Sequence, residues 1–175
     1  MNTANEFSVV VRLDDIGAGA SQHTIVANEI QRAALAKRFD LVRIDELTAD
    51  ISVAKTAAGI AANGHLHAKL VQTCTATAAD VPAAINEPID LLFIPEPTEG
   101  SEVDLASEEC DTMFHDGRGV DIGEVAAQSM GLALNPYPRS KGAEKALRAA
   151  GVRNEEEEKI ASGPFAMLAG LKSKS

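Results

Sequence analysis

Apolar and polar residues alternate in the first part of the chain, between Phe7 and Leu13 and again around His23 to Ala27. A period of two places successive side chains on opposite faces of a strand. The first stretch is therefore predicted to be a strand with one buried face, and the second to be a short strand. The predicted buried face of the first strand holds Phe7, Val9, Val11 and Leu13.

Two helices are predicted from the residues that would cap their N-termini. Asn28 is followed three residues later by Gln31, which is the spacing of a capping box and predicts a helix that ends near Phe39. Asp121 and Glu124 have the same spacing and predict a second helix, because an apolar stripe at helical spacing follows them.

The chain between Leu41 and Pro95 is typical of a meander, because three apolar faces recur there at a period of two. Such alternation indicates antiparallel strands with one solvated face. Pro82 and Pro88 lie in the third strand, and since proline has no N–H to donate, this strand is expected at a sheet edge or with a bulge. The three faces are Leu47, Ala49, Ile51 and Val53; Leu66, Ala68, Leu70 and Cys74; and Val81, Ala83, Ile85, Ile89, Leu91 and Phe93.

These elements predict an α+β fold: an antiparallel sheet or partly open, barrel-like meander of about five to seven strands, with two main helices and a C-terminal tail. Residues 1–139 are expected to form a single domain that contains a mobile acidic loop at residues 96–119. Residues 140–175 are expected to be a charged linker and an apolar tail, and the segment from Lys141 to Asn154 is able to form a helix.

The chain is acidic, with 26 Asp and Glu against 16 Lys and Arg and a formal net charge of −10. This balance disfavours a general affinity for nucleic acids, which depends on cations that release counterions. Eight acids and no Lys or Arg lie between Glu96 and Asp116. They are Glu96, Glu99, Glu102, Asp104, Glu108, Glu109, Asp111 and Asp116, and the first six are candidate residues for binding a basic partner.

A second candidate partner-binding segment is an apolar strip near the C-terminus, formed by Phe165, Leu168 and Leu171 at helical spacing. The strip is too short to be a stable helix alone. Two interpretations remain open: it packs back on its own domain, or it docks in the groove of a partner.

Candidate RNA-binding cations occur in two groups along the chain. The first group is Arg32, Lys37 and Arg38, and the second is Arg139, Lys141, Lys145 and Arg148. Without interleaved aromatic residues the second group offers no platform on which single-stranded bases would stack. The alternative interpretation is a solvated helix face.

The histidines and cysteines of the chain do not have the spacing of a metal site or of a catalytic site. His65 and His67 share one face of a strand, but a zinc site needs three or four ligands, so both are expected to face solvent. Cys74 is expected to be a core residue, because it falls on the apolar face with Leu66 and Leu70. It is not expected to be a nucleophile, because no adjacent cation or helix N-terminus would lower the pKa of its thiol. No catalytic residue, metal site or cofactor is predicted.

Six short motifs occur in a specific order along most of the chain. They are Val71-Gln72-Thr73-Cys74, Val81-Pro82, Ile89 to Glu96, Val120 to Glu124, Leu132 to Arg139 and Pro164 to Lys172. Together they resemble the YceD family, the bacterial large ribosomal RNA subunit accumulation proteins, in the form common in alphaproteobacteria. The resemblance implies a role in the synthesis, processing or accumulation of 23S ribosomal RNA, with no catalytic residues established.

The resemblance also bears on metal binding. Many members of the family carry Cys-x-x-Cys in the hairpin and further cysteines toward the C-terminus, which implies a metal site in those proteins. Here Cys74 is retained and Thr77 stands at the place of the second cysteine, with no cysteine after Cys110. We therefore expect no zinc site in this chain.

The leading hypothesis is a non-enzymatic ribosome biogenesis factor that binds a basic ribosomal protein or a large-subunit precursor particle. One alternative is direct binding of a 23S rRNA precursor by the basic residues, and another is a metal-dependent enzyme. The chain has no signal-peptide pattern and no apolar run of about 18 residues or more. A cytoplasmic monomer without a membrane partner is therefore expected.

Overall fold

The computed structural model describes residues 5–17, 19–96 and 111–152. These residues contain seven strands and three helices. In chain order they are β1 (Val10–Arg12), β2 (Ser21–Val26), α1 (Glu29–Arg38), β3 (Arg43–Lys55), β4 (Ile60–Thr73), β5 (Asp80–Pro95), β6 (Asp111–His115), β7 (Gly119–Asp121), α2 (Ile122–Leu132) and α3 (Ala143–Ala149).

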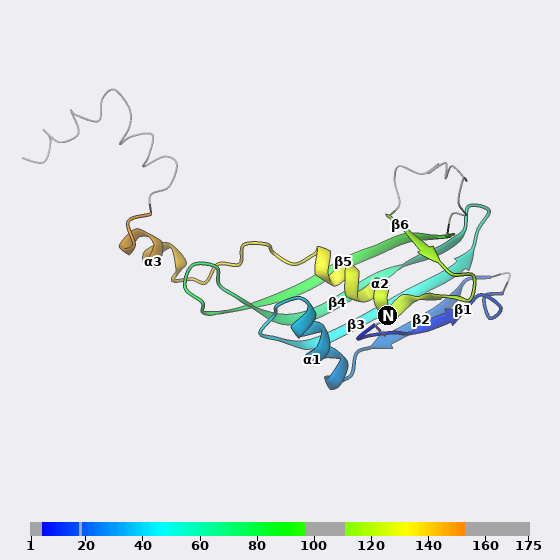
Figure 1. Cartoon of the computed structure of the whole chain (residues 1–175), viewed down its shortest axis with the longest axis horizontal. Helices are drawn as coiled ribbons and strands as arrows, with labels where there is room; N and C mark the ends of the chain where they lie inside the picture. Colours follow the sequence, from blue (N-terminus) through cyan, green and yellow to red (C-terminus); the bar gives the residue numbers. More distant parts are fainter. Residues whose placement is uncertain (1–4, 18, 97–110, 153–175) are drawn as a thin grey trace, which may run out of the picture.

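The main sheet has five strands in the order β2-β3-β4-β5-β6, and a second sheet pairs β1 with β7. All pairs are antiparallel except β5 with β6, which run parallel. Figure 1 shows the main sheet as an open, elongated layer in which β3, β4 and β5 are the long strands. The predicted α+β class with an open sheet is confirmed, although the parallel pair departs from the expected antiparallel meander.

One face of the main sheet is covered by α1 and α2, and the core lies between these layers (Figure 1). Leu35 of α1 and Met130 of α2 are fully buried in the same apolar cluster as residues from β3 and β4. The sheet contributes Leu47, Ala49, Ile51, Val53, Leu66, Ala68 and Leu70 to this cluster, which are the faces that the alternation predicts. The opposite face of the sheet is exposed along β4, where polar side chains alternate with the buried ones.

Local sequence signals place both main helices correctly. The side chain of Asn28 accepts from the backbone N–H of Gln31, whose own side chain accepts from the backbone of Asn28, so the predicted capping box is present. Asp121 caps α2 and accepts from the N–H groups of Gly123 and Glu124. The side chain of Glu124 does not complete a second box, because it binds Arg38 instead.

The third long strand is an edge strand over most of its length, as its prolines predict. β5 pairs with β4 from Asp80 to Phe93, and β6 covers its other side only from Leu91 to Pro95. Pro82 and Pro88 both lie in the part of β5 that pairs with β4 alone among the described strands. A missing N–H is tolerated there, since it need not join a ladder.

The expectation of a loop over residues 96–119 is wrong in its second part. Residues 111–115 form β6, and β7 begins at Gly119. Met113 packs against the core, whereas the adjacent Phe114 is exposed, and acidic residues stand at Asp111 and Asp116. Acidic residues dominate the composition of this segment, which favoured the prediction of a loop. The strand is too short for an alternation of apolar and polar residues to be recognised in the sequence. Residues 97–110 lie outside the described residues.

Candidate functional site

The segment after α2, residues 135–141, lies along the turn that joins β4 to β5, and we call it the strap. The side-chain amide of Gln72 donates to the backbone oxygen of Asn135 at 2.9 Å. The backbone N–H and the hydroxyl of Thr75 both donate to the backbone oxygen of Pro138, at 3.0 and 3.3 Å. The strap is therefore held to the end of β4 and to the β4–β5 turn by hydrogen bonds at Asn135 and Pro138.

Cys74 forms the inner part of the same contact. Its side chain is only 2% exposed, as expected for a core residue. The backbone N–H of Ser140 donates to Sγ at 3.2 Å, and the hydroxyls of Ser140 and Thr77 lie 3.0 Å apart. The Ser140 hydroxyl first, then the Thr77 hydroxyl and the N–H groups of Ser140 and Ala76, lower the pKa of the Cys74 thiol to about 6.

The lowered pKa has a cause other than a cation or a helix N-terminus, the two causes considered from the sequence. A thiolate is stabilised by any donor that points at the sulfur, and a cation or a helix N-terminus is not required. Ser140 is 66 residues away in the sequence, so its contribution was not visible in the residues adjacent to Cys74. Ser140 reaches the sulfur because the strap runs along the turn.

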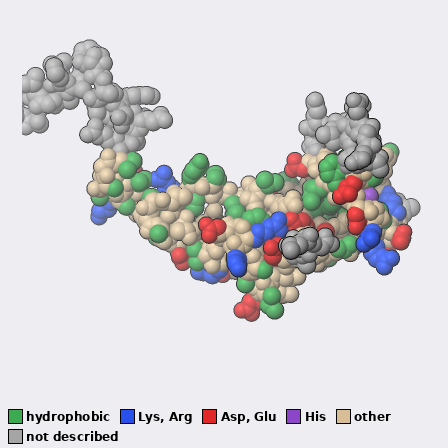
Figure 2. All heavy atoms as spheres, in the orientation of Figure 1, with side chains coloured by type: hydrophobic (Ala, Val, Ile, Leu, Met, Phe, Trp, Pro, Cys, Tyr) green, Lys and Arg blue, Asp and Glu red, His purple; other side chains and the backbone are tan. Residues whose placement is uncertain are grey.

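The strap and α3 carry the second group of predicted RNA-binding cations. Pro138 is buried and Ser140 is half-buried against the turn, whereas Tyr137, Arg139 and Lys141 are exposed. Exposed Lys145 and Arg148 follow on α3, and Arg148 pairs with Glu144 at 2.9 Å. Figure 2 shows Lys and Arg side chains at the end of the molecule that α3 occupies.

Tyr137 is the residue that sequence reasoning missed. Its side chain is 72% exposed, and it is the one tyrosine of the chain. The sequence contains a signal for it, because Tyr137 stands two residues before Arg139 and is flanked by prolines on both sides. Prolines favour an extended backbone, in which alternate side chains leave a surface together.

The first group of predicted RNA-binding cations does not converge. The guanidinium of Arg38 donates to both carboxylate oxygens of Glu124, at 2.7 and 2.9 Å, and to Glu6 at 3.1 Å. It also lies 5.2 Å from the ring centroid of Phe39. The hydrogen bonds that Arg38 donates to Glu124 raise the pKa of Arg38, which remains charged. Arg38 therefore joins α1 to α2 and to the N-terminal residues.

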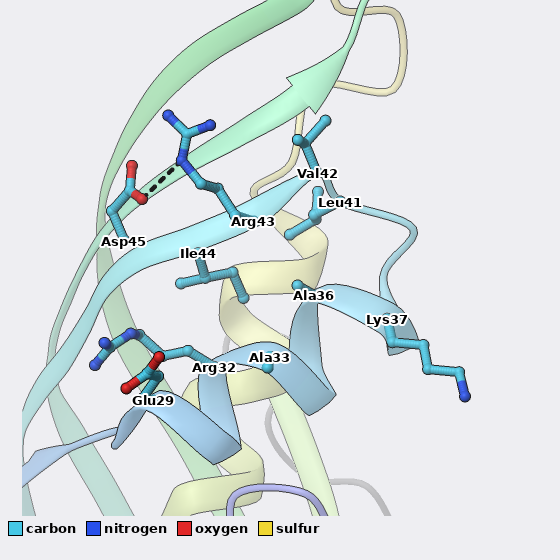
Figure 3. A pocket seen from close by; sticks show the side chains of 10 residues that line it. All are labelled: Glu29, Arg32, Ala33, Ala36, Lys37, Leu41, Val42, Arg43, Ile44 and Asp45. Atoms are coloured by element: carbon cyan, nitrogen blue, oxygen red, sulfur yellow. Dashed lines mark hydrogen bonds and ion pairs between the residues drawn. The ribbon is translucent and has the colours of Figure 1, made fainter.

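Arg32 and Lys37 border a groove of about 550 Å³ between α1 and the start of β3. Arg32 donates to the backbone oxygen of Ala27 at 2.7 Å, and its Nε is buried without a hydrogen-bond partner. Figure 3 shows the side chain of Lys37 pointing away from the groove, while Arg43 pairs with Asp45 at 2.9 Å. These cations point in different directions and form no common anion site.

The exposed face of the main sheet carries the two histidines. His65 and His67 are exposed on β4, as predicted. Glu46 on β3 pairs with Lys69 at 2.6 Å, and this contact lowers the pKa of Glu46 and raises that of Lys69. Among the described residues, no group of three or more His, Cys, Asp or Glu side chains has the arrangement of a metal site.

Most of the predicted partner-binding residues lie outside the described part of the chain. Glu96 is exposed and directly follows β5. The others are Glu99, Glu102, Asp104, Glu108, Glu109, Phe165, Leu168 and Leu171, and the structure describes none of these residues.

A comparison with protein families identifies the family of this chain. The model of the family described as large ribosomal RNA subunit accumulation protein YceD matches residues 62–172. This chain belongs to the YceD family. The match includes β4, β5, the strap and α3, and it extends into the C-terminal residues.

The other comparisons add no relative. Neither a curated protein nor a solved structure matches the YceD-family chain. Within the described ranges, none of its helices has the length and apolar character needed to cross a membrane. The family description connects the protein with the accumulation of large-subunit ribosomal RNA.

Proposed function

We propose that this protein promotes the accumulation of 23S ribosomal RNA by binding a precursor of the large subunit in the cytoplasm, and that it makes and breaks no covalent bond itself. Membership of the YceD family carries this proposal. The dense acidic segment supports it, because complementary charge favours association with a basic partner.

The acidic segment is the proposed contact for a basic ribosomal protein in that precursor. It combines Glu96, which is exposed, with seven further acids up to Asp116 and no cation. Complementary charge across an interface speeds the encounter of two partners and sets the salt dependence of their binding. The net charge of −10 adds to this attraction at long range.

The test is the binding of purified large-subunit precursor particles to the full chain by co-sedimentation. The test variant changes four acids of the segment, namely Glu99, Glu102, Glu108 and Glu109, to Gln. We expect an affinity lower by about tenfold at physiological salt, together with a weaker dependence on salt. Equal affinity and an equal salt dependence would contradict the acidic contact.

A matched control removes the same charge elsewhere. Asp14, Asp15, Glu29 and Glu87 are exposed acids outside the segment, and their neutralisation to Asn or Gln gives the same change in net charge. If this control loses affinity to the same extent, net charge alone determines binding and the segment has no specific role. Wild-type protein that does not bind the particle at all would contradict the proposed function as a whole.

A further inference from the structure

The strap presents an aromatic ring beside cations on a fixed backbone. Tyr137 is 72% exposed although tyrosine rings are commonly half-buried or more. Arg139 and Lys141 are exposed at the next alternate positions, and Lys145 follows on α3. Exposed aromatic rings with neighbouring cations are the features that proteins use to bind single-stranded nucleic acid, since every base has a face that stacks.

The local charge at this place has the opposite sign to the whole chain. Residues 135–152 contain Arg139, Lys141, Lys145 and Arg148 against Glu144 alone. Figure 1 places α3 at one end of the elongated molecule and β6 at the other, so the exposed acids Asp111 and Asp116, in and next to β6, lie far from the strap. Exposed charges farther apart than about 8 Å are largely screened at physiological salt. The strap is thus a local cationic surface on an acidic protein.

The backbone of the strap is ordered before any ligand binds. The contacts from Gln72 and Thr75 fix two of its carbonyl groups, and the Cys74 sulfur accepts from the N–H of Ser140. The free energy of ligand binding therefore does not include an entropic cost of ordering this backbone. The side chains of Tyr137 and Arg139 make none of these contacts and remain available to a ligand.

We propose that the strap and α3 bind single-stranded RNA, with the ring of Tyr137 stacked on a base and with Arg139, Lys141 and Lys145 against phosphates. This inference rests on the proposed function, because it assigns the strap to the RNA component of the large-subunit precursor. Single-stranded RNA is favoured over an acidic protein segment because the site combines a free aromatic face with the cations.

The test measures binding of the full chain to a fluorescent single-stranded RNA by anisotropy, at about 0.1 M salt where phosphate contacts remain strong. We expect Tyr137→Ala to weaken binding by about tenfold, because one stacked base is lost. Tyr137→Phe keeps the ring and is expected to bind like the wild type. Tyr137 is exposed, so neither change should disturb the fold, and a thermal melt checks this.

The cations are tested separately from the ring. Lys141→Gln combined with Lys145→Gln is expected to weaken binding and to reduce the magnitude of the slope of log affinity against log salt by about 1.4, because two phosphate contacts to a single strand are lost. The matched control is Arg12→Gln combined with Lys55→Gln, which removes two exposed cations from β1 and the end of β3. We expect this control to bind RNA like the wild type.

The outcomes separate this inference from the proposed function. Wild-type protein that binds the precursor particle but not the RNA would overturn the role of the strap and leave the proposed function standing. Unchanged RNA affinity in the Tyr137→Ala variant would also overturn it. Equal competition by RNA and by polyglutamate would show a plain cationic patch and would overturn the stacking. Failure to bind both particle and RNA would contradict both proposals.

Discussion

At the scale of single residues, Cys74 shows how an acidic protein without a nearby cation can lower the pKa of a thiol. Hydroxyl and N–H donors from Ser140, Thr77 and Ala76 are directed at the sulfur and bring its pKa to about 6. The sequence correctly predicted that Cys74 is buried, because burial follows from its place in the alternation. The lowered pKa was not predictable, because its first cause, the hydrogen bond with Ser140, comes from a segment distant in sequence.

The lowered pKa predicts a dependence of stability on pH. The thiol ionises near pH 9 when unfolded and near pH 6 when folded, so the native state is favoured increasingly as the pH rises from 6 to 9. The stabilisation of the native state by the thiolate is complete at pH values above the thiol pKa of the unfolded chain. It is lost as the pH falls toward 6. Cys74→Ser retains a hydrogen-bonding group that does not titrate in this range.

Urea unfolding at several pH values between 6 and 9 checks this expectation. The free energy of unfolding of the wild type should rise with pH relative to that of the Cys74→Ser variant. Two curves that remain parallel across this range would show that the thiol keeps an ordinary pKa in the folded protein.

At the scale of elements, Asp121 joins the start of α2 to the N-terminal part of the chain. Its carboxylate accepts from the N–H groups of Gly123 and Glu124 at 3.1 and 3.2 Å, and from that of Val9 at 2.9 Å. The close approach leaves no room for a side chain at Gly123, where a Cβ atom would lie 2.5 Å from the backbone oxygen of Phe7.

Asp121→Ala removes the cap and leaves these N–H groups without their acceptor. We expect a loss of about 1–2 kcal/mol in the free energy of unfolding, which is the range for N-cap residues. Thermal or urea unfolding measures this loss. Asp14→Ala is the matched control, because the Asp14 side chain is 91% exposed. A loss of similar size in the control would refute the specific role of the cap.

The elements that the sequence predicted well are those whose causes are local. The pair Asn28 and Gln31 predicts the start of α1, and Asp121 predicts the start of α2. Each of these signals lies within four consecutive residues, and both helix starts are correct. The parallel pairing of β5 with β6 has no local cause, because parallel strands require a long connection and their partners are distant in sequence. Tyr137 was missed for a similar reason, since its exposure depends on how the β4–β5 turn holds the strap.

At the scale of the whole molecule, α3 and β6 are separated along the long axis. The strap and α3 lie at one end and β6 at the other, with the covered sheet between them (Figure 1). The described core draws only on residues up to Leu134, apart from Ala143, which is also buried. The fold therefore has its main packing before the strap begins.

This arrangement predicts the effect of removing the C-terminal residues. A chain that ends before Pro164 is expected to keep the thermal stability of the full chain, because the described core lies well before that point. It is expected to lose affinity for precursor particles, since the strip of Phe165, Leu168 and Leu171 is removed. Thermal melts and co-sedimentation measure the two effects. A lower melting temperature would show instead that the strip packs on its own domain.

The part of β5 that pairs with β4 alone among the described strands affects the tendency of the protein to aggregate at high local concentration. An open strand edge is a template on which another chain can form hydrogen bonds, and it promotes aggregation. Pro82 and Pro88 interrupt the donors along this edge, so a second copy would find no continuous ladder to extend. At high local concentration these prolines therefore oppose polymerisation of the protein through β5.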